Sequence, residues 1–419
     1  MKVERNKLLS VLSEALDNVE KELFGVTGHH GKRVAWLCVQ MGEQMEMSQE
    51  ELSDLAVSAL LHDNALSEYQ DEYENGSLKP GISGKNHCRV GEKHLQMIPG
   101  CHSLRGFVLY HHECADGSGP FHKKANETPL GAQLVHIADE VDLRFALGTC
   151  ALSDVEKIRE YVRAKEGTLF GTEAVNCFLD IFSEECLEVL ADNTIEQCEL
   201  EIAPVWIPME AGGKANIYTI AGLFAEIIDY KSSFTSRHSM GLAQKAEKMA
   251  QYYEYDEQTT AQLYLAGALH DIGKLLVRLD ILEKPDRLEK EEYRHIQSHA
   301  YETWRLLSKV PGLETVTAWA ANHHEKLNGT GYPFGKRAEE LGEKERLMAC
   351  LDIYQALTEE RPYKAGMPHA KVICILREMA EKQELDAKIV EDIAVALQSD
   401  AGMVQKTEIE KAVETKTAK

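Results

Sequence analysis

Long apolar runs are missing from this 419-residue sequence: its most apolar stretches, such as 56–61 and 263–269, are far too short to span a bilayer, which takes ~20 residues. The first residues include no continuous apolar segment, so we expect no secretory signal. None of the ten cysteines forms a CxxC pair, which indicates reduced and mostly buried thiols. We therefore expect a cytoplasmic protein that does not contact a membrane.

Basic residues are also scarce. The chain has 46 Lys and Arg against 69 Asp and Glu, a net charge of −23. DNA and RNA binding require clustered positive charge, so we expect neither as a partner, although a local basic pocket could hold a small anion. The 44% hydrophobic and 27% charged content is typical of globular proteins, and the length predicts two or three domains.

Alternating β-type patterns are absent, and helical spacing dominates. Apolar residues recur at helical intervals in 6–24, 241–253 and 371–382, so we expect an all-α fold. The stretch 198–215 contains two prolines and a Gly-Gly pair, which a helix does not continue through. We predict a first domain at 1–197, a linker at 198–215, a second domain at 216–403 and a charged tail at 404–419.

The chain contains an internal repeat of histidine and aspartate. Each half has a single His, a His-Asp pair, a second single His, a His-His pair and an Asp, and the two sets are 208 to 213 residues apart. We infer a tandem duplication of one helical domain. The first set is His30, His62, Asp63, His87, His111, His112 and Asp139, and the second is His238, His270, Asp271, His299, His323, His324 and Asp352.

Imidazole and carboxylate are common ligands of Fe, Mn and Zn. Seven such groups exceed the needs of one catalytic zinc and suit two metals that share a carboxylate. A His-Asp pair on a helix points its side chains about 100° apart, so each could reach a different metal, and two metals can activate water and clamp a phosphoryl oxygen. The alternative is a set of hydrogen-bonded core histidines. Cys88 and Cys114 adjoin these histidines, and we interpret both as small core residues.

Two motifs resemble the HD-GYP branch of the HD superfamily of metal-dependent phosphohydrolases. They are His-Asp-Ile-Gly-Lys at 270–274 and His-His-Glu-Lys-Leu-Asn-Gly-Thr-Gly-Tyr-Pro at 323–333. The resemblance covers about 217–380 and, more distantly, 20–150. It implies an all-α fold, a centre of two or three metals and hydrolysis of a cyclic dinucleotide. The substrate would be cyclic di-GMP, giving pGpG or GMP, or 3′,3′-cGAMP.

The resemblance also implies residue roles in the second half. Asp271 would bridge two divalent metals, Lys274 would contact the scissile phosphate, and Phe234 occupies the position of a third-metal Glu, so we expect two metals. Iron is favoured, with Mn, Co or Ni as alternatives. The first metal would be held by His238, His270, Asp271 and Asp352, the second by His299, His323 and His324, and the substrate by Lys274, the loop Gly331, Tyr332 and Pro333, Arg361 and Lys364.

The first half keeps all seven ligand types but has Leu66 at the lysine position, and Gly119-Pro120 lacks the Tyr. We expect it to bind metal and to be regulatory or dimerising rather than a second active site. Two other functions stay open for the whole chain: a cyclic-dinucleotide sensor without catalysis, and a hydrolase of noncyclic nucleotides. A homodimer and contacts with other signalling proteins are also open.

Overall fold

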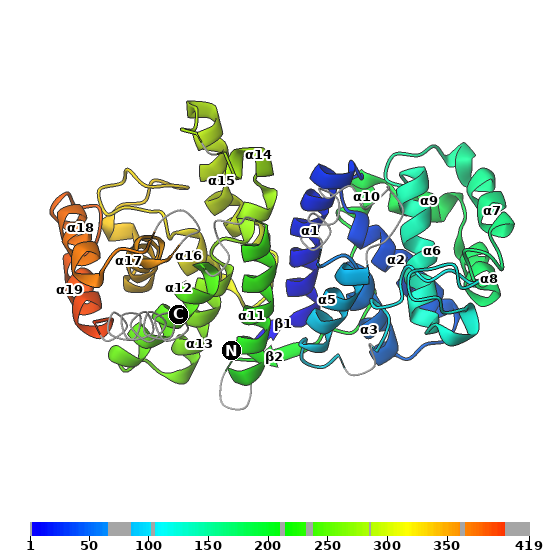
Figure 1. Ribbon diagram of the computed structural model, residues 1–419, viewed down its shortest axis with the longest axis horizontal. Coiled ribbons are helices and arrows are strands. Elements are labelled where there is room, and N and C mark those ends of the chain that lie inside the picture. Colours follow the sequence, from blue (N-terminus) through cyan, green and yellow to red (C-terminus); the bar gives the residue numbers. More distant parts are fainter. Residues whose placement is uncertain are drawn as a thin grey trace, which may run out of the picture. The chain divides into compact units, whose positions relative to one another are not determined.

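The computed structural model describes residues 2–65, 85–101, 105–209, 214–231, 238–284, 286–360 and 365–398. Four residues singled out from the sequence, Leu66, Phe234, Arg361 and Lys364, lie outside these ranges, as does the tail at 404–419. The chain forms two compact units, Val3–Ile207 and Pro208–Lys419, the latter joined by Met1–Lys2. Figure 1 colours the first unit from blue to green and the second from green to red.

The N-terminal unit is helical, as expected. Its α2 packs against α3 and α6, while α1 covers α2 and α3. The helix predicted over 6–24 corresponds to α1. The α-helices are α1 (Arg5–Phe24), α2 (His30–Gln44), α3 (Gln49–Leu60), α5 (Lys85–Gln96), α6 (Leu130–Phe145), α7 (Val155–Ala164), α8 (Thr172–Ile181), α9 (Glu184–Leu190) and α10 (Asp192–Ile195).

The C-terminal unit repeats this packing, with α12 against α13 and α17. The helices predicted over 241–253 and 371–382 correspond to α12 and α18, with ends one to three residues away. The helices are α11 (Lys214–Tyr230), α12 (His238–Tyr252), α13 (Glu257–Leu269), the 3₁₀ helix η3 (Ile272–Leu276), α14 (Leu279–Leu282), α15 (Lys290–Leu307), α16 (Glu314–Ala321), α17 (Glu343–Thr358), α18 (His369–Glu381) and α19 (Ala387–Ala396).

One central helix in each unit is buried around its whole circumference. In α13 every residue from Thr260 to Leu269 is buried, and α3 is similarly buried from Leu52 to Leu60. The N-caps of these helices, Ser48 and Asp256, accept hydrogen bonds from Glu51 N (3.3 Å) and Thr259 N (2.7 Å), so both helices start at equivalent points of the repeat. His270-Asp271 directly follows α13, and His62-Asp63 follows α3 after one residue, Leu61, so each pair lies at the end of a buried helix.

Two short strands are the exception to the helical fold in the described part of the chain. β1 (Lys2–Glu4) pairs with β2 (Trp206–Pro208). β2 lies inside the segment predicted as a linker, and α11 starts at Lys214, one residue before the predicted end of that segment. Among the described helices, none combines the length and apolar character needed to cross a membrane.

Candidate metal centres

The seven recurring residues of the second half come from five helices or their ends. His238 begins α12, His299 lies in α15 and Asp352 lies in α17. The pair His270-Asp271 immediately follows α13, and His323-His324 follows α16 after one residue, Asn322. Our expectation that the His-Asp pair lies on a helix is wrong, because α13 ends at Leu269 and the chain turns there into η3. The structure nevertheless brings all seven side chains together.

The carboxylate of Asp271 lies at the middle of this cluster. Its Oδ2 is 3.1 Å from His270 Nε2 and 3.9 Å from His238 Nε2. Its Oδ1 faces the opposite way, 3.4 Å from His299 Nε2 and 3.8 Å from His323 Nε2. Ligand atoms bound to one metal at ~2.1 Å also stand about 3–4 Å apart. The two oxygens of one carboxylate therefore serve two separate groups of histidines.

Asp352 connects the remaining members of the cluster. Its Oδ1 is 3.1 Å from His238 Nε2, and its Oδ2 is 3.5 Å from His324 Nδ1. Three subsets have donor atoms close enough to share an ion: His238, His270 and Asp352; His270, Asp271 and His323; and His299, His323 and His324.

Hydrogen bonds orient three of these imidazoles toward the centre. Nδ1 of His270, His299 and His323 lies 2.6 to 2.7 Å from the carbonyl oxygen three residues earlier. A carbonyl only accepts, so Nδ1 carries the proton and donates it. The Nε2 lone pair is then directed inward, which is the usual second-shell arrangement of histidine ligands to metals.

The protonation states suit a cation in the centre. Burial lowers the pKa of His299 to about 3 and that of His324 to about 4, which keeps both imidazoles neutral as metal ligands require. Burial alone would raise the pKa of Asp271, but His270 and Lys274 outweigh it and hold that pKa well below its usual range. His299 and His324 therefore offer neutral imidazoles and Asp271 an ionised carboxylate. By contrast, Asp352 and Glu359 outweigh the effect of burial and raise the pKa of His238 to about 9, so a metal bound there would have to displace a proton.

Two buried polar atoms in the cluster have no hydrogen-bond partner within the described part of the chain, namely His270 Nε2 and Asp271 Oδ1. Leaving such atoms unsatisfied is costly. A metal ion would satisfy both, so the donor set fits the divalent metal that the sequence motif implies. Lys274, also singled out from the motif, donates from Nζ to Asp271 Oδ2.

The turn that carries Lys274 is fixed against α15. A Cβ at Gly273 would lie 2.0 Å from the carbonyl oxygen of His299, so only glycine permits this approach. Thr303 joins the same two segments, because its Oγ1 donates to His270 O (2.9 Å) and accepts from Gly273 N (3.1 Å). The positions of the first and second histidine groups are thereby coupled.

The predicted loop at 331–333 adjoins the centre. The Tyr332 ring lies 4.7 Å from that of His324, and Tyr332 N donates to His324 O over 3.2 Å. Glu325 ties the loop down by accepting hydrogen bonds from Phe334 N (2.7 Å) and Lys336 N (2.9 Å). We did not predict this role, although the Glu of both His-His-Glu motifs could have indicated it.

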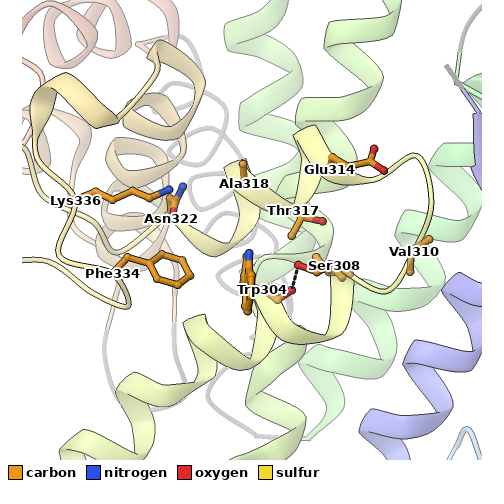
Figure 2. Close-up of a pocket in the computed structure, with 10 residues that line it drawn as sticks. Trp304, Ser308, Val310, Glu314, Thr317, Ala318, Asn322, Phe334 and Lys336 are labelled. Carbon is orange, nitrogen blue, oxygen red and sulfur yellow. Dashed lines mark hydrogen bonds between the residues drawn. The ribbon is translucent and has the colours of Figure 1, made fainter. Parts of the chain in front are cut away.

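A cavity of about 460 Å³ is lined by Phe334 and Lys336, which follow this loop, and by residues of α15 and α16. Figure 2 shows Phe334 facing Trp304 across it, with Lys336 beside Asn322. The two rings are 5.7 Å apart, nearly perpendicular. None of the predicted ligands lines this cavity, and no sequence motif indicated it.

The first half forms a matching cluster. Asp63 Oδ1 is 3.5 Å from His111 Nε2 and 3.7 Å from His87 Nε2, while its Oδ2 is 3.8 Å from His62 Nε2. Asp139 Oδ1 lies 3.3 Å from His30 Nε2. The donor atoms of His30, His62 and Asp139 form one group, and those of His87, Cys88, His111 and His112 form another.

Residues that the sequence did not single out support both clusters. Asp142 Oδ2 lies 2.6 Å from His30 Nδ1, and Glu359 Oε2 lies 3.2 Å from His238 Nδ1. Cys88 joins the first-half cluster as a potential ligand, so our interpretation of it as a core residue is incomplete. Burial raises the pKa of its thiol, but His111 and His87 outweigh this effect and lower the pKa to about 7.

Comparison with known proteins agrees with this duplication. Models of the HD domain match residues 27–144 and 222–389. A 3′3′-cGAMP-specific phosphodiesterase 1 of Vibrio cholerae is 29% identical over 390 residues, covering 91% of this chain and 89% of the relative. A cyclic di-GMP phosphodiesterase of Pseudomonas aeruginosa is 36% identical over 149 residues, 35% of each chain.

The fold is similar to one solved structure as well. It is titled as a cyclic GMP-AMP-specific phosphodiesterase of Vibrio cholerae and gives a TM-score of 0.65, with 24% identity. The match covers 95% of this chain and 98% of that one. The tandem helical architecture is therefore shared over nearly the whole length.

Proposed function

Because this chain belongs to the HD-domain family and carries two of its domains, we propose that it is a metal-dependent phosphodiesterase that hydrolyses a cyclic dinucleotide. The observation that carries the proposal is the placement of Asp271, whose two carboxylate oxygens face different histidine groups. We assign the activity to this C-terminal centre, with two divalent metals, iron favoured over Mn, Co or Ni.

In this proposal His238, His270 and Asp352 hold one metal, His299, His323 and His324 hold the other, and Asp271 bridges them. Metals bound there would supply Lewis acidity toward a phosphoryl oxygen and would acidify water. The hydrogen bonds from Nδ1 to backbone carbonyls keep the imidazoles in the tautomer whose Nε2 lone pair can bind a metal.

Lys274 supplies the positive charge for the phosphate. Its Nζ lies at the cluster and its side chain is 19% exposed, whereas Asp271 is only 3% exposed. An ammonium at the open side of the centre can meet an incoming phosphate and stabilise the negative charge that develops on it. Arg361 and Lys364 remain proposed phosphate contacts, and Tyr332 packs over His324 at the edge of the site.

We propose 3′,3′-cGAMP as the first substrate to test, with cyclic di-GMP second. The relatives that match nearly the whole chain are named as 3′3′-cGAMP-specific, whereas the cyclic di-GMP phosphodiesterase of Pseudomonas matches only 35% of it. We propose a regulatory or dimerising role for the N-terminal centre.

The test is product analysis of Fe(II)- or Mn(II)-loaded full-length protein with a panel of cyclic and noncyclic nucleotides. Conversion of a cyclic dinucleotide to a linear product would support the proposal. Binding of a cyclic dinucleotide without turnover, in protein shown to contain metal, would instead indicate a sensor. Turnover confined to noncyclic nucleotides would indicate a hydrolase of noncyclic nucleotides.

A further inference from the structure

The N-terminal centre has one donor more than its C-terminal counterpart. Cys88 follows His87 on α5 and is fully buried, with Sγ 3.4 Å from His87 Nε2. The possible ligand atoms of His87, Cys88, His111 and His112 all lie within 4.8 Å of one another. Four donors therefore converge on one point.

The C-terminal unit has three donors at the equivalent place. His299, His323 and His324 form the corresponding group, and the residue after His299 is Ala300, a buried methyl. Among the described residues, no cysteine belongs to any of the C-terminal groups. The thiol is thus an addition specific to the first domain.

A second observation indicates that this group holds a ligand. His111 is fully buried, and its Nε2 has no hydrogen-bond partner within the described part of the chain. Its Nδ1 lies 2.5 Å from Val108 O, which fixes the proton on Nδ1 and aims the Nε2 lone pair into the group. The facing Asp63 Oδ1 likewise lacks a hydrogen-bond partner among these residues.

We propose that Cys88 is a thiolate ligand and completes a three-histidine, one-cysteine site that selects Zn²⁺. Zinc accepts sulfur and imidazole nitrogen together in a tetrahedral arrangement, and a soft thiolate favours zinc over manganese. Four protein ligands close the coordination sphere. The site then leaves no position for a reacting water, so this half of the centre is structural, and the inference is independent of the activity assigned to the second domain.

The direct test uses the wild-type full-length protein loaded with zinc. X-ray absorption at the zinc edge should show a sulfur neighbour at ~2.3 Å. In cobalt-substituted protein we expect a near-ultraviolet sulfur-to-cobalt charge-transfer band. Zinc with only nitrogen and oxygen neighbours, in protein that contains metal in its N-terminal half, would overturn the proposal.

A pair of variants supplies the matched comparison. Cys88→Ala should abolish the charge-transfer band and weaken zinc binding in chelator competition by more than ~100-fold, above the range for loss of an outer-sphere partner. Cys114→Ala is the control: Cys114 also adjoins the His-His pair but is outside the four-donor group of the described residues, and should leave both readouts unchanged. A charge-transfer band that persists in Cys88→Ala would refute the assignment of Cys88 as a ligand. If that variant does not fold, the X-ray absorption measurement on the wild-type protein still tests the assignment.

Discussion

Lys274 donates a hydrogen bond from its Nζ to Oδ2 of Asp271, the carboxylate oxygen that also lies 3.1 Å from His270 Nε2. Burial lowers the pKa of the lysine, but Asp271 outweighs this and raises it above its usual value. The ammonium is therefore charged at neutral pH and is held at the open side of the proposed centre. One turn of the chain therefore positions both the proposed metal ligand Asp271 and the proposed phosphate contact Lys274.

Asp271→Ala should remove metal and activity from the C-terminal centre. The side chain faces both histidine groups, so its loss takes a ligand from each proposed metal. Metal catalysis supplies several kcal/mol, which corresponds to a loss of turnover of ~10³-fold or more. Metal analysis and cyclic-dinucleotide turnover measure the two effects.

Asp286→Ala, which removes an exposed carboxylate, is the control and should behave as wild type. Unchanged metal stoichiometry in Asp271→Ala would rule out the bridging role.

Lys274→Ala should retain metal but lower turnover by ~10²–10³-fold, the usual loss when one positioned electrostatic contact is removed. No predicted ligand is lost, so metal content per chain should match the wild type. Steady-state kinetics alongside metal analysis would separate these effects. Lys290→Ala, at an exposed position on α15, provides the matched loss of a lysine. Near wild-type turnover in Lys274→Ala would mean that the lysine does not act on the phosphate.

Asp63→Ala should leave most of the activity intact. Asp63 occupies the position in the first half that Asp271 occupies in the second, and we assign hydrolysis to the second. Independent sites influence one another by only ~0.5 kcal/mol, so turnover should fall by no more than ~2-fold, while metal is lost from the group of His30, His62 and Asp139, which Asp63 Oδ2 faces. Comparing turnover of Asp63→Ala and Asp271→Ala tests the division of labour.

If Asp63→Ala is as damaging as Asp271→Ala in folded protein that keeps its C-terminal metal, the first domain is catalytic or strongly coupled to the second.

The stability of the metal-free C-terminal unit should depend on Asp229. This buried carboxylate accepts hydrogen bonds from Ser239 Oγ (2.6 Å) and Ser239 N (3.1 Å) at the start of α12, and burial raises its pKa to about 6. Its protonated form therefore stabilises the fold fully below the unfolded pKa of ~3.9, and this contribution is lost as pH rises to about 6.

Asp229→Asn has no carboxylate to ionise at this position. As pH rises across that window, the wild type should therefore lose stability relative to this variant by roughly 1 kcal/mol per pH unit. Hydrogen exchange of the α12 amides in chelator-treated protein, compared at equal pH, measures this difference. Asp286→Asn, at an exposed position, should show no such trend. The prediction would be contradicted if the difference in stability between the wild type and Asp229→Asn did not change with pH.

The sequence by itself determined the helical class, the duplication and the seven His and Asp residues that recur in each cluster. Apolar spacing is a local property, and it located α1, α12 and α18 closely. The repeat of His and Asp needs no structure to detect. It grouped residues as distant as His238 and Asp352, whose side chains lie 3.1 Å apart.

Only the tertiary structure decided how these side chains face one another. That Asp271 directs each oxygen to a different histidine group depends on the turn after α13 and on the close approach of η3 to α15. Cys88 looks like a core cysteine in sequence, and it becomes a fourth donor because α5 places it within reach of His111 and His112. Such convergence depends on packing between helices distant along the chain, and a ligand set is defined by distances of a few ångströms that local residue patterns do not encode.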